Sequence, residues 1–348
     1  MFRTRTRFLM VGAFMLLLVP ALAACGSSST SGGTSTKTYK IGLVTDTGGL
    51  NDKSFNHLAD VGVMKAKTDL HVTTAVKESH SDADYVPNLT GFATSGYDLV
   101  IAVGFNLAAA VGSVSLQFPN TKFALIDSEP ADAQGNSVTR TNVASLLFKE
   151  QEAGALVGVI SGMLEKNGKT KLKQNTISAV GGVSIPPVNH YIAGYKWAAQ
   201  MEDPGLKVLV GYSNDFTDPT KCAGIANTQI GSGSDIVFQV AGGCGNGALT
   251  AAGQKGVYSL GVDADQGYVD SSVIASALKR VDVATFDVIQ SVVNGTFKSG
   301  DTTFSLANGG VGFAVDSTTV VTADIQTEVT RVENAIKGGT MTVPDTIQ

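Results

Sequence analysis

Side chains that can hold a small polar solute recur directly after the apolar runs of this sequence. Each such position offers a carboxylate, an aromatic ring or glycines, and arginine is nearly absent from them. Carboxylates accept hydrogen bonds from hydroxyl and N–H groups, and phenylalanine rings offer faces on which a flat base can stack. This inventory predicts a neutral, hydroxyl-rich aromatic solute and fits phosphorylated ligands poorly. The segments are Thr45–Asn56, Gly104–Asn106, Asp127–Ser128, Asn214–Pro219, Gly242–Gly245 and Asp263–Gln266.

Short β-rich runs alternate with amphipathic segments from Tyr39 onward, which predicts right-handed βαβ units and mostly parallel sheets. Most of these runs are apolar throughout, as strands buried on both faces should be. The expected strands are Tyr39–Val44, Val72–Val76, Leu99–Val103, Phe123–Ile126, Thr176–Val180, Lys207–Tyr212, Ile236–Val240 and Val257–Val262. The expected helices are Phe55–Lys67, Tyr85–Ser95, Leu107–Phe118, Phe148–Leu164, Val188–Gln200, Thr220–Ile230 and Gly247–Lys255.

The alternating pattern occurs twice, with a break near Val138–Leu147, so we expect an α/β fold of two doubly wound parallel-sheet lobes. Later strands at Ile274–Leu278 and Gly312–Val315 flank a helix at Val281–Val293 and are candidates for further crossings between the lobes. Several connecting strands would make a multi-strand hinge beside a cleft, which would collect the polar segments. We expect lobe I to comprise residues 39–143 and 277–302, and lobe II residues 144–276 and 303–348.

The first 24 residues have the features of a bacterial export signal. Three arginines precede an apolar run at Phe8–Leu22, which is too short for a membrane span. The run ends in Leu22–Cys25, which resembles a lipobox with a lipidated cysteine; an ordinary secretory signal with a chance cysteine is the alternative. Residues 25–38 then form a tether rich in Gly, Ser and Thr. We therefore expect an extracytoplasmic body, lipid-anchored to the bacterial cell membrane through Cys25.

The formal net charge is −5, and loss of the signal removes three arginines and no acid. Acidic proteins repel polyanions, which argues against nucleic-acid polymers as partners. The glycine-rich segment Gly243–Gly247 lacks the Lys-Ser/Thr of a phosphate-binding loop, and the four histidines lack the spacing of a zinc motif. We therefore expect a binding protein without enzymatic activity, cofactor or metal.

Cys222 and Cys244 are the cysteines that remain after Cys25. Outside the cytoplasm, an even pair of cysteines predicts a disulfide. Two free buried thiols and a metal-binding pair are the alternatives. Metal binding is disfavoured because neither a histidine nor a third cysteine lies near either residue in the sequence.

Six motifs follow one another along the body of the chain. They are Val44–Gly49 with Asp52–Asn56, Glu150–Gly154, Asp215–Pro219, Ala241–Gly245, Gly261–Gln266 and Ser276–Val281. In order and spacing they resemble the basic membrane protein family, the nucleoside-binding lipoproteins of ABC importers. The resemblance implies a type I periplasmic-binding fold, and it spans essentially the whole chain after the signal and tether.

The resemblance also implies which residues bind the ligand. They are Asp46, Phe55, Asn56, Asp127, Phe216, Gly242, Asp263 and Lys279. Phe55 and Phe216 would sandwich the base, one from each lobe, and Asp46 and Asp127 would bond its polar edge. The alternative for either ring is a core residue at the start of a helix.

The sugar contacts implied by the resemblance involve Asp263 and Lys279, with the backbone of Gly242 nearby. A solvated strand end is the alternative for Lys279. We therefore expect a monomeric solute-binding lipoprotein that delivers a nucleoside, a purine nucleoside in particular, to the permease and ATPase of an ABC importer. A sensory or adhesive receptor with the same fold is the second hypothesis. A nucleoside hydrolase that uses Asp46 and Asp52 is the third.

Overall fold

The computed structural model describes residues 37–347, and the compact body of the chain begins at Thr38. The expected signal at 1–24, the lipidated Cys25 and nearly all of the 25–38 tether lie outside the described residues, so they stay predictions. Within residues 37–347, no helix is both long enough and apolar enough to cross a membrane.

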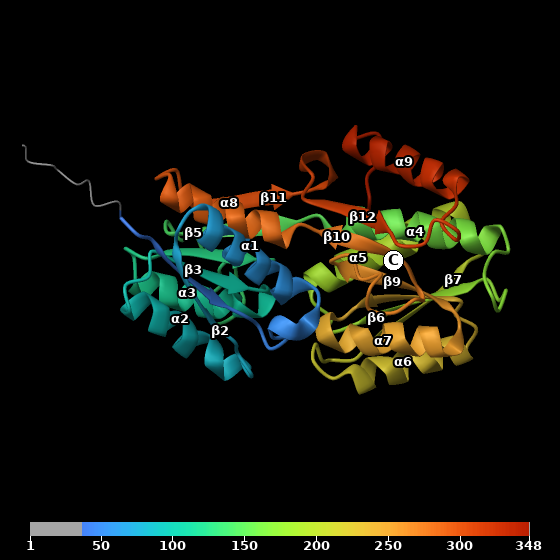
Figure 1. The fold of residues 1–348 in the computed structure, drawn as a ribbon, viewed down its shortest axis with the longest axis horizontal. Coiled ribbons are helices and arrows are strands. Elements are labelled where there is room, and N and C mark those ends of the chain that lie inside the picture. The colour runs from blue at the N-terminus through green and yellow to red at the C-terminus, as the bar shows by residue number, and fades with distance from the viewer. Residues whose placement is uncertain (1–36, 348) are drawn as a thin grey trace, which may run out of the picture. The chain divides into compact units, whose positions relative to one another are not determined.

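Two six-stranded sheets form the centre of the body (Figure 1). The first has the order β11-β5-β4-β3-β1-β2 and the second β12-β10-β9-β8-β6-β7, and only β10 and β12 pair antiparallel. The strands are β1 Lys40–Val44, β2 Thr73–Lys77, β3 Leu99–Val103, β4 Lys122–Ile126, β5 Val143–Phe148, β6 Thr176–Gly181, β7 Lys207–Tyr212, β8 Ile236–Val240, β9 Tyr258–Asp263, β10 Val273–Lys279, β11 Gly300–Phe304 and β12 Val311–Val315. The predicted α/β fold with two parallel-sheet lobes is confirmed.

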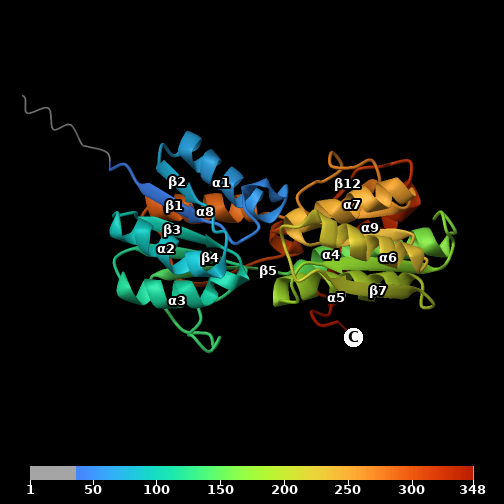
Figure 2. The same cartoon turned by 90° about the horizontal axis from the view of Figure 1, so that it is seen from below.

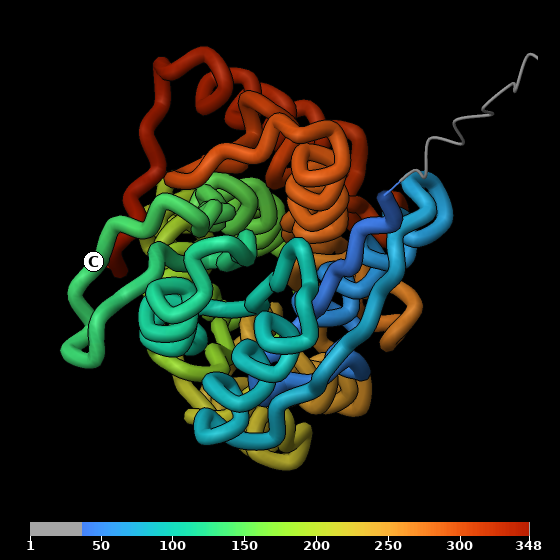
Figure 3. The backbone as a smooth tube through the Cα atoms, turned by 90° about the vertical axis from the view of Figure 1, so that its left-hand side faces the viewer, coloured from blue at the N-terminus to red at the C-terminus, as the bar shows by residue number. Residues whose placement is uncertain are grey.

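Helices cover both faces of each sheet (Figure 2). In lobe I, α1 and α8 lie on one face and α2 and α3 on the other; in lobe II, α4, α5 and α9 lie opposite α6 and α7. Figure 3 shows the orange α8 beside the blue α1, although they are far apart in the sequence. The helices are α1 Phe55–Asp69, α2 Tyr85–Thr94, α3 Ala108–Gln117, α4 Glu150–Lys166, α5 Pro186–Glu202, α6 Pro219–Gly231, α7 Gly242–Lys255, α8 Val281–Val293 and α9 Ala323–Lys337.

The central strands are buried on both faces, which explains why their sequences are continuous apolar runs. In β1, Ile41 and Leu43 belong to the core beneath α1 and α8, while Val44 belongs to the core beneath α2 and α3. All five residues of β3 are buried. The alternating sides of a strand thus feed two separate cores.

The strand β5 was missed by the sequence pattern, which placed a break at Val138–Leu147. β5 pairs with β4, so the first crossing between the sheets lies at Lys149 and not at the expected boundary 143/144. The strand runs into α4 through this single residue, without the glycine or proline that usually marks the end of a strand. The other crossings, after β10 and after β11, likewise lie a few residues beyond the expected boundaries 276/277 and 302/303.

The strand β11 was also missed, because an exposed edge strand carries no apolar run. Its residues are mostly polar and exposed, and it pairs with β5 along one edge of the first sheet. The three crossings are bonded to one another: the Lys149 backbone N–H donates to Phe304 O at 2.9 Å, and that of Arg280 donates to Gly310 O at 2.9 Å. The rings of Phe148 and Phe304 stack with their centroids 4.9 Å apart. These contacts make a three-segment hinge.

Helix α7 begins five residues earlier than predicted. The prediction missed its first turn because that turn is rich in glycine, a poor helix former. The glycines let α7 approach its neighbours: a Cβ on Gly247 would lie 1.9 Å from Pro219 O, and one on Gly245 would lie 1.7 Å from Gln239 Oε1. The predicted disulfide is confirmed, and it joins Cys222 on α6 to Cys244 on α7 with their Cα atoms 5.5 Å apart.

Removal of this disulfide is expected to lower the free energy of unfolding by about 3 kcal/mol, because the bond restricts the unfolded chain. The variant Cys222→Ala/Cys244→Ala tests this by denaturant unfolding. Reductant should destabilise the wild type to a similar extent and leave the double variant unchanged. Equal stability of oxidised and reduced wild type would contradict the prediction.

Candidate ligand-binding site

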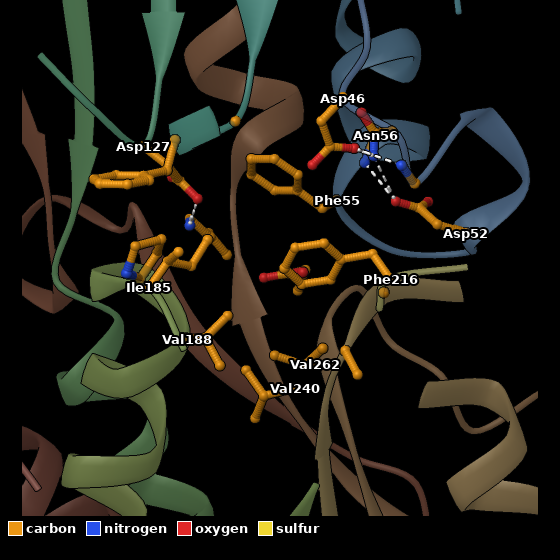
Figure 4. A pocket seen from close by; sticks show the side chains of 18 of the residues that line it. Asp46, Asp52, Phe55, Asn56, Asp127, Ile185, Val188, Phe216, Val240 and Val262 are labelled. Atoms are coloured by element: carbon orange, nitrogen blue, oxygen red, sulfur yellow. Dashed lines mark hydrogen bonds and ion pairs between the residues drawn. The ribbon is translucent and has the colours of Figure 1, made fainter. Parts of the chain in front are cut away.

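A pocket lies between the two lobes at the carboxyl ends of strands from both sheets (Figure 4). The space that it encloses, including the part that opens to solvent, is about 590 Å³. All eight residues expected to bind the ligand line it, namely Asp46, Phe55, Asn56, Asp127, Phe216, Gly242, Asp263 and Lys279. The structure therefore brings the predicted set together, while the part each residue plays stays a prediction.

Asp46 follows β1 and presents one side of its carboxylate to the pocket. Its Oδ1 accepts hydrogen bonds from Asn56 Nδ2 and from the Gly48 backbone N–H, both at 2.8 Å. Among the described residues the other oxygen, Oδ2, has no hydrogen-bond partner, and Figure 4 shows it pointing into the pocket. Burial raises the pKa of Asp46 to about 6, although the bonds from Asn56 and Gly48 oppose the shift. Asn56 thus orients Asp46 as well as lining the pocket.

Asp52 has a structural part in the same loop. Its carboxylate accepts backbone hydrogen bonds from Ser54 at 2.9 Å, Asn56 at 2.7 Å and His57 at 3.1 Å. It therefore satisfies N–H groups of the first turn of α1, which a helix start leaves without partners. Burial raises the pKa of Asp52, and these hydrogen bonds oppose the rise. Within residues 37–347, no three His, Cys, Asp or Glu side chains group as a metal site would require.

The rings of Phe55 and Phe216 enter the pocket from opposite lobes (Figure 4). Phe55 is the first residue of α1, and Phe216 lies in the loop between β7 and α6. The Phe216 ring packs on the backbone of Gly182, where a Cβ would lie 2.3 Å from the ring. The carbonyl of Phe216 accepts the backbone N–H of Cys244 at 2.9 Å, so the disulfide-bonded α7 holds this loop.

Lys279 ends β10 and is buried, with 1% of its side chain exposed, so the alternative of a solvated strand end is wrong. Its Nζ donates to Asp127 Oδ2 at 2.6 Å and to Glu150 Oε1 at 2.8 Å. It also lies 5.1 Å from the centroid of the Phe55 ring. Burial lowers the pKa of Lys279, but the surrounding carboxylates outweigh it and raise the pKa. The ammonium is therefore positively charged, and its hydrogen bonds to Asp127 and Glu150 fix its position.

Asp127 and Asp263 are buried carboxylates beside this ammonium. Asp127 Oδ1 has no hydrogen-bond partner among the described residues. Asp263 Oδ1 accepts from the Tyr191 hydroxyl at 3.0 Å, and its Oδ2 accepts from Ser54 Oγ at 2.8 Å. Burial raises the pKa of both acids, against the attraction of Lys279. Asp127 Oδ1 can therefore still accept a hydrogen bond, whereas both oxygens of Asp263 are already engaged.

Sequence reasoning missed the apolar side of the pocket. Val188, Val240 and Val262 lie together on the side away from Asp46, with Ile185 nearby (Figure 4). An apolar residue at a strand end carries no signal that separates a pocket wall from core. Tyr191 was missed for the same reason, since only its bond to Asp263 shows its position in the site.

The lobes touch each other directly beside the pocket. Ser54 Oγ donates to Val262 O at 3.1 Å, Gln266 Nε2 donates to Lys53 O at 3.3 Å, and Asn246 Nδ2 donates to Asp52 O at 3.3 Å. The bond from Ser54 Oγ to Asp263 Oδ2 described above also spans the lobes, because Ser54 belongs to lobe I and Asp263 to lobe II. The structure is therefore a closed arrangement of the two lobes.

A family model described as ABC transporter substrate-binding protein PnrA-like, Bmp, matches residues 40–346. The chain belongs to the Bmp family. It is accordingly an ABC transporter substrate-binding protein, and the resemblance inferred from the six motifs is confirmed.

Bmp-family relatives cover most of this chain. The ABC transporter nucleoside-binding protein BmpA of Lactococcus lactis is 31% identical over 366 residues, which is 98% of this chain and 99% of that protein. An uncharacterised lipoprotein of Pyrococcus abyssi is 35% identical over 311 residues, or 86% of this chain and 74% of that protein. A crystal structure of an ABC transporter solute-binding protein from Aeropyrum pernix K1 is 28% identical, with a TM-score of 0.79, and covers 88% of this chain and 94% of that one.

Proposed function

We propose that this Bmp-family protein captures a nucleoside, a purine nucleoside in particular, between its two lobes. The observation that carries the proposal is the entry of Phe55 and Phe216 from separate lobes into one pocket. A flat base between two rings gains roughly 1–3 kcal/mol from each stacked contact. Pyrimidines offer less stacking area than purines, so the ring pair favours a purine.

The polar groups of the pocket favour a neutral ligand that donates hydrogen bonds. Asp46 Oδ2 and Asp127 Oδ1 are acceptors without partners among the described residues. The lysine beside them is already paired with two carboxylates, so it offers no free countercharge to a phosphate. The name of the Lactococcus lactis relative, a nucleoside-binding protein, supports this ligand class.

Capture follows from contacts that exist only when the lobes are closed. A ligand touched by both lobes binds the closed form better than the open form and shifts the population toward it. We propose that the closed form then delivers its ligand to an ABC permease from outside the membrane, to which Cys25 anchors it. The lipoprotein name of the Pyrococcus abyssi relative supports the anchor.

Isothermal titration calorimetry of the purified body with adenosine, guanosine, inosine, cytidine and uridine tests the ligand class. We expect binding of at least one purine nucleoside, weaker binding of the pyrimidines and none of the 5′-monophosphates. Absence of heat from all five nucleosides would refute the proposed function, and equal binding of the monophosphates would refute the electrostatic argument.

Nucleoside affinity is expected to fall below about pH 6, where Asp46 loses its charge. A bound N–H donor favours the carboxylate, so binding lowers the pKa of Asp46 and releases a proton near pH 6. The loss approaches about tenfold per pH unit at the acid limit if one proton is released. Calorimetry in buffers of different ionisation enthalpy measures that proton, and Asp46→Asn should reduce the release. A pH-independent affinity between pH 5 and 7.5 would contradict the prediction.

A further inference from the structure

Glu150 is a buried carboxylate that lies beside the pocket without lining it. It is the first residue of α4, directly after the crossing at Lys149, and 2% of its side chain is exposed. The pocket residues include its partner Lys279 but not Glu150 itself. Glu150 lines the neighbouring hollow instead, so we expect it to act on a ligand in the pocket through another group.

Lys279 is that group. A lysine ammonium has three N–H donors, and the bonds to Asp127 and Glu150 use two of them. The ammonium lies between the Phe55 and Phe148 rings, at 5.1 Å and 4.8 Å from their centroids. Two carboxylates on different lobes and two rings thus fix its position, and one donor is left for a ligand.

Glu150 and Asp127 attract the Lys279 ammonium from different lobes. Asp127 follows β4 in lobe I, whereas Glu150 and Lys279 belong to lobe II. Without Glu150, the ammonium would have Asp127 as its remaining bonded carboxylate, and it could then occupy the unpartnered Oδ1 as well. The ligand would then lose a hydrogen-bond donor, the Lys279 ammonium, and an acceptor, Asp127 Oδ1.

Two further features keep Glu150 ionised and oriented. Its position in the first turn of α4 places the carboxylate at the positive end of the helix dipole. Its second oxygen, Oε2, lies 3.1 Å from His190 Nδ1, whose side chain is 30% exposed on a neighbouring, wider hollow. Burial raises the pKa of Glu150, but attraction by Lys279 and the bond from His190 outweigh it, so the pKa is lowered.

We propose that Glu150, held by His190, is a positioning residue that aims the Lys279 ammonium at a hydroxyl-bearing part of the ligand and so selects ribosides over deoxygenated analogues. The proposal rests on the proposed function, because it needs a nucleoside in the pocket. It assigns selectivity to a residue that the ligand does not touch.

The test compares the tightest-binding nucleoside of the calorimetric panel with its 2′,3′-dideoxy form. We expect the wild type to bind the riboside more tightly and Glu150→Gln to lower that preference roughly tenfold, since an ammonium drawn away by Asp127 no longer donates its charge-assisted hydrogen bond to the ligand hydroxyl. His190→Gln should lower it less. A structural role would weaken both ligands equally, and such a result would overturn the proposal.

A double-mutant cycle tests whether Glu150 acts on the ligand through Lys279. In a Lys279→Met background, Glu150→Gln should leave the preference for the riboside unchanged, because its target is gone; a further loss would overturn the proposal. Glu165→Gln is the matched control, a buried carboxylate at the far end of the same helix, and should keep the wild-type preference. No wild-type binding of either ligand would refute the proposed function, and this inference with it.

Discussion

Lys279→Met is expected to lower the free energy of unfolding by about 3–5 kcal/mol, the typical cost of removing one partner of a buried ion pair. The substitution leaves Asp127 and Glu150, both nearly inaccessible to solvent, without their shared cation. Methionine has a similar length, so the loss reports on charge more than on packing. Urea unfolding at pH 7.5 measures it.

The stability difference between Lys279→Met and the wild type should shrink as the pH falls from 8 to 5. In the variant, the buried Asp127 and Glu150 lack a cation, so their folded-state pKa values rise above those of the unfolded chain. The folded variant then takes up protons and gains stability as the pH falls through those values. A difference that does not change with pH would contradict this account.

Lys337→Met is the matched control for Lys279→Met. Lys337 also pairs with a carboxylate, Glu333, at 2.6 Å, but its side chain is 41% exposed on α9. Exposed pairs of this kind contribute at most about 1 kcal/mol. Equal losses in the two variants would mean that burial of the Lys279 cluster has no energetic importance.

Phe216→Ala is expected to weaken nucleoside binding roughly tenfold or more, which corresponds to the loss of one stacked ring. The ring is half-buried, lines the pocket and comes from the lobe opposite to Phe55. Because the ring belongs to the lobe opposite to Phe55, its loss should also weaken closure of the lobes around a ligand. Calorimetry with the tightest-binding nucleoside measures the change.

Phe286→Ala is the matched control for the ring. Phe286 is a half-buried phenylalanine on α8 that lies beneath Lys65 and does not line the pocket. The Phe286→Ala variant should have a lower free energy of unfolding and an unchanged affinity for the nucleoside. Unchanged affinity in Phe216→Ala would assign that ring to packing alone, and the sandwich would then be wrong.

The sequence by itself determined the fold class, because period and composition are local properties of the chain. Buried strands such as Leu99–Val103 are apolar at every position, and the helices between them have their own pattern. It also located the polar segments that follow the strands and line the pocket, since parallel strands place their carboxyl ends at one edge of a sheet. A local pattern could not find β5 or β11, where the chain enters a helix without a turn residue or runs along an exposed edge.

Only the tertiary structure decided how the charges of the pocket are paired. Lys279 and Glu150 are far apart in the sequence, and nothing local distinguishes a buried lysine at a strand end from a solvated one. The same holds for Tyr191 and the three valines, whose side chains meet the pocket because α5, β8 and β9 converge there. Electrostatic pairing depends on burial and on the distances between charged groups. For residues that are remote in the sequence, folding sets those distances, so the pairing cannot be predicted from a local sequence pattern.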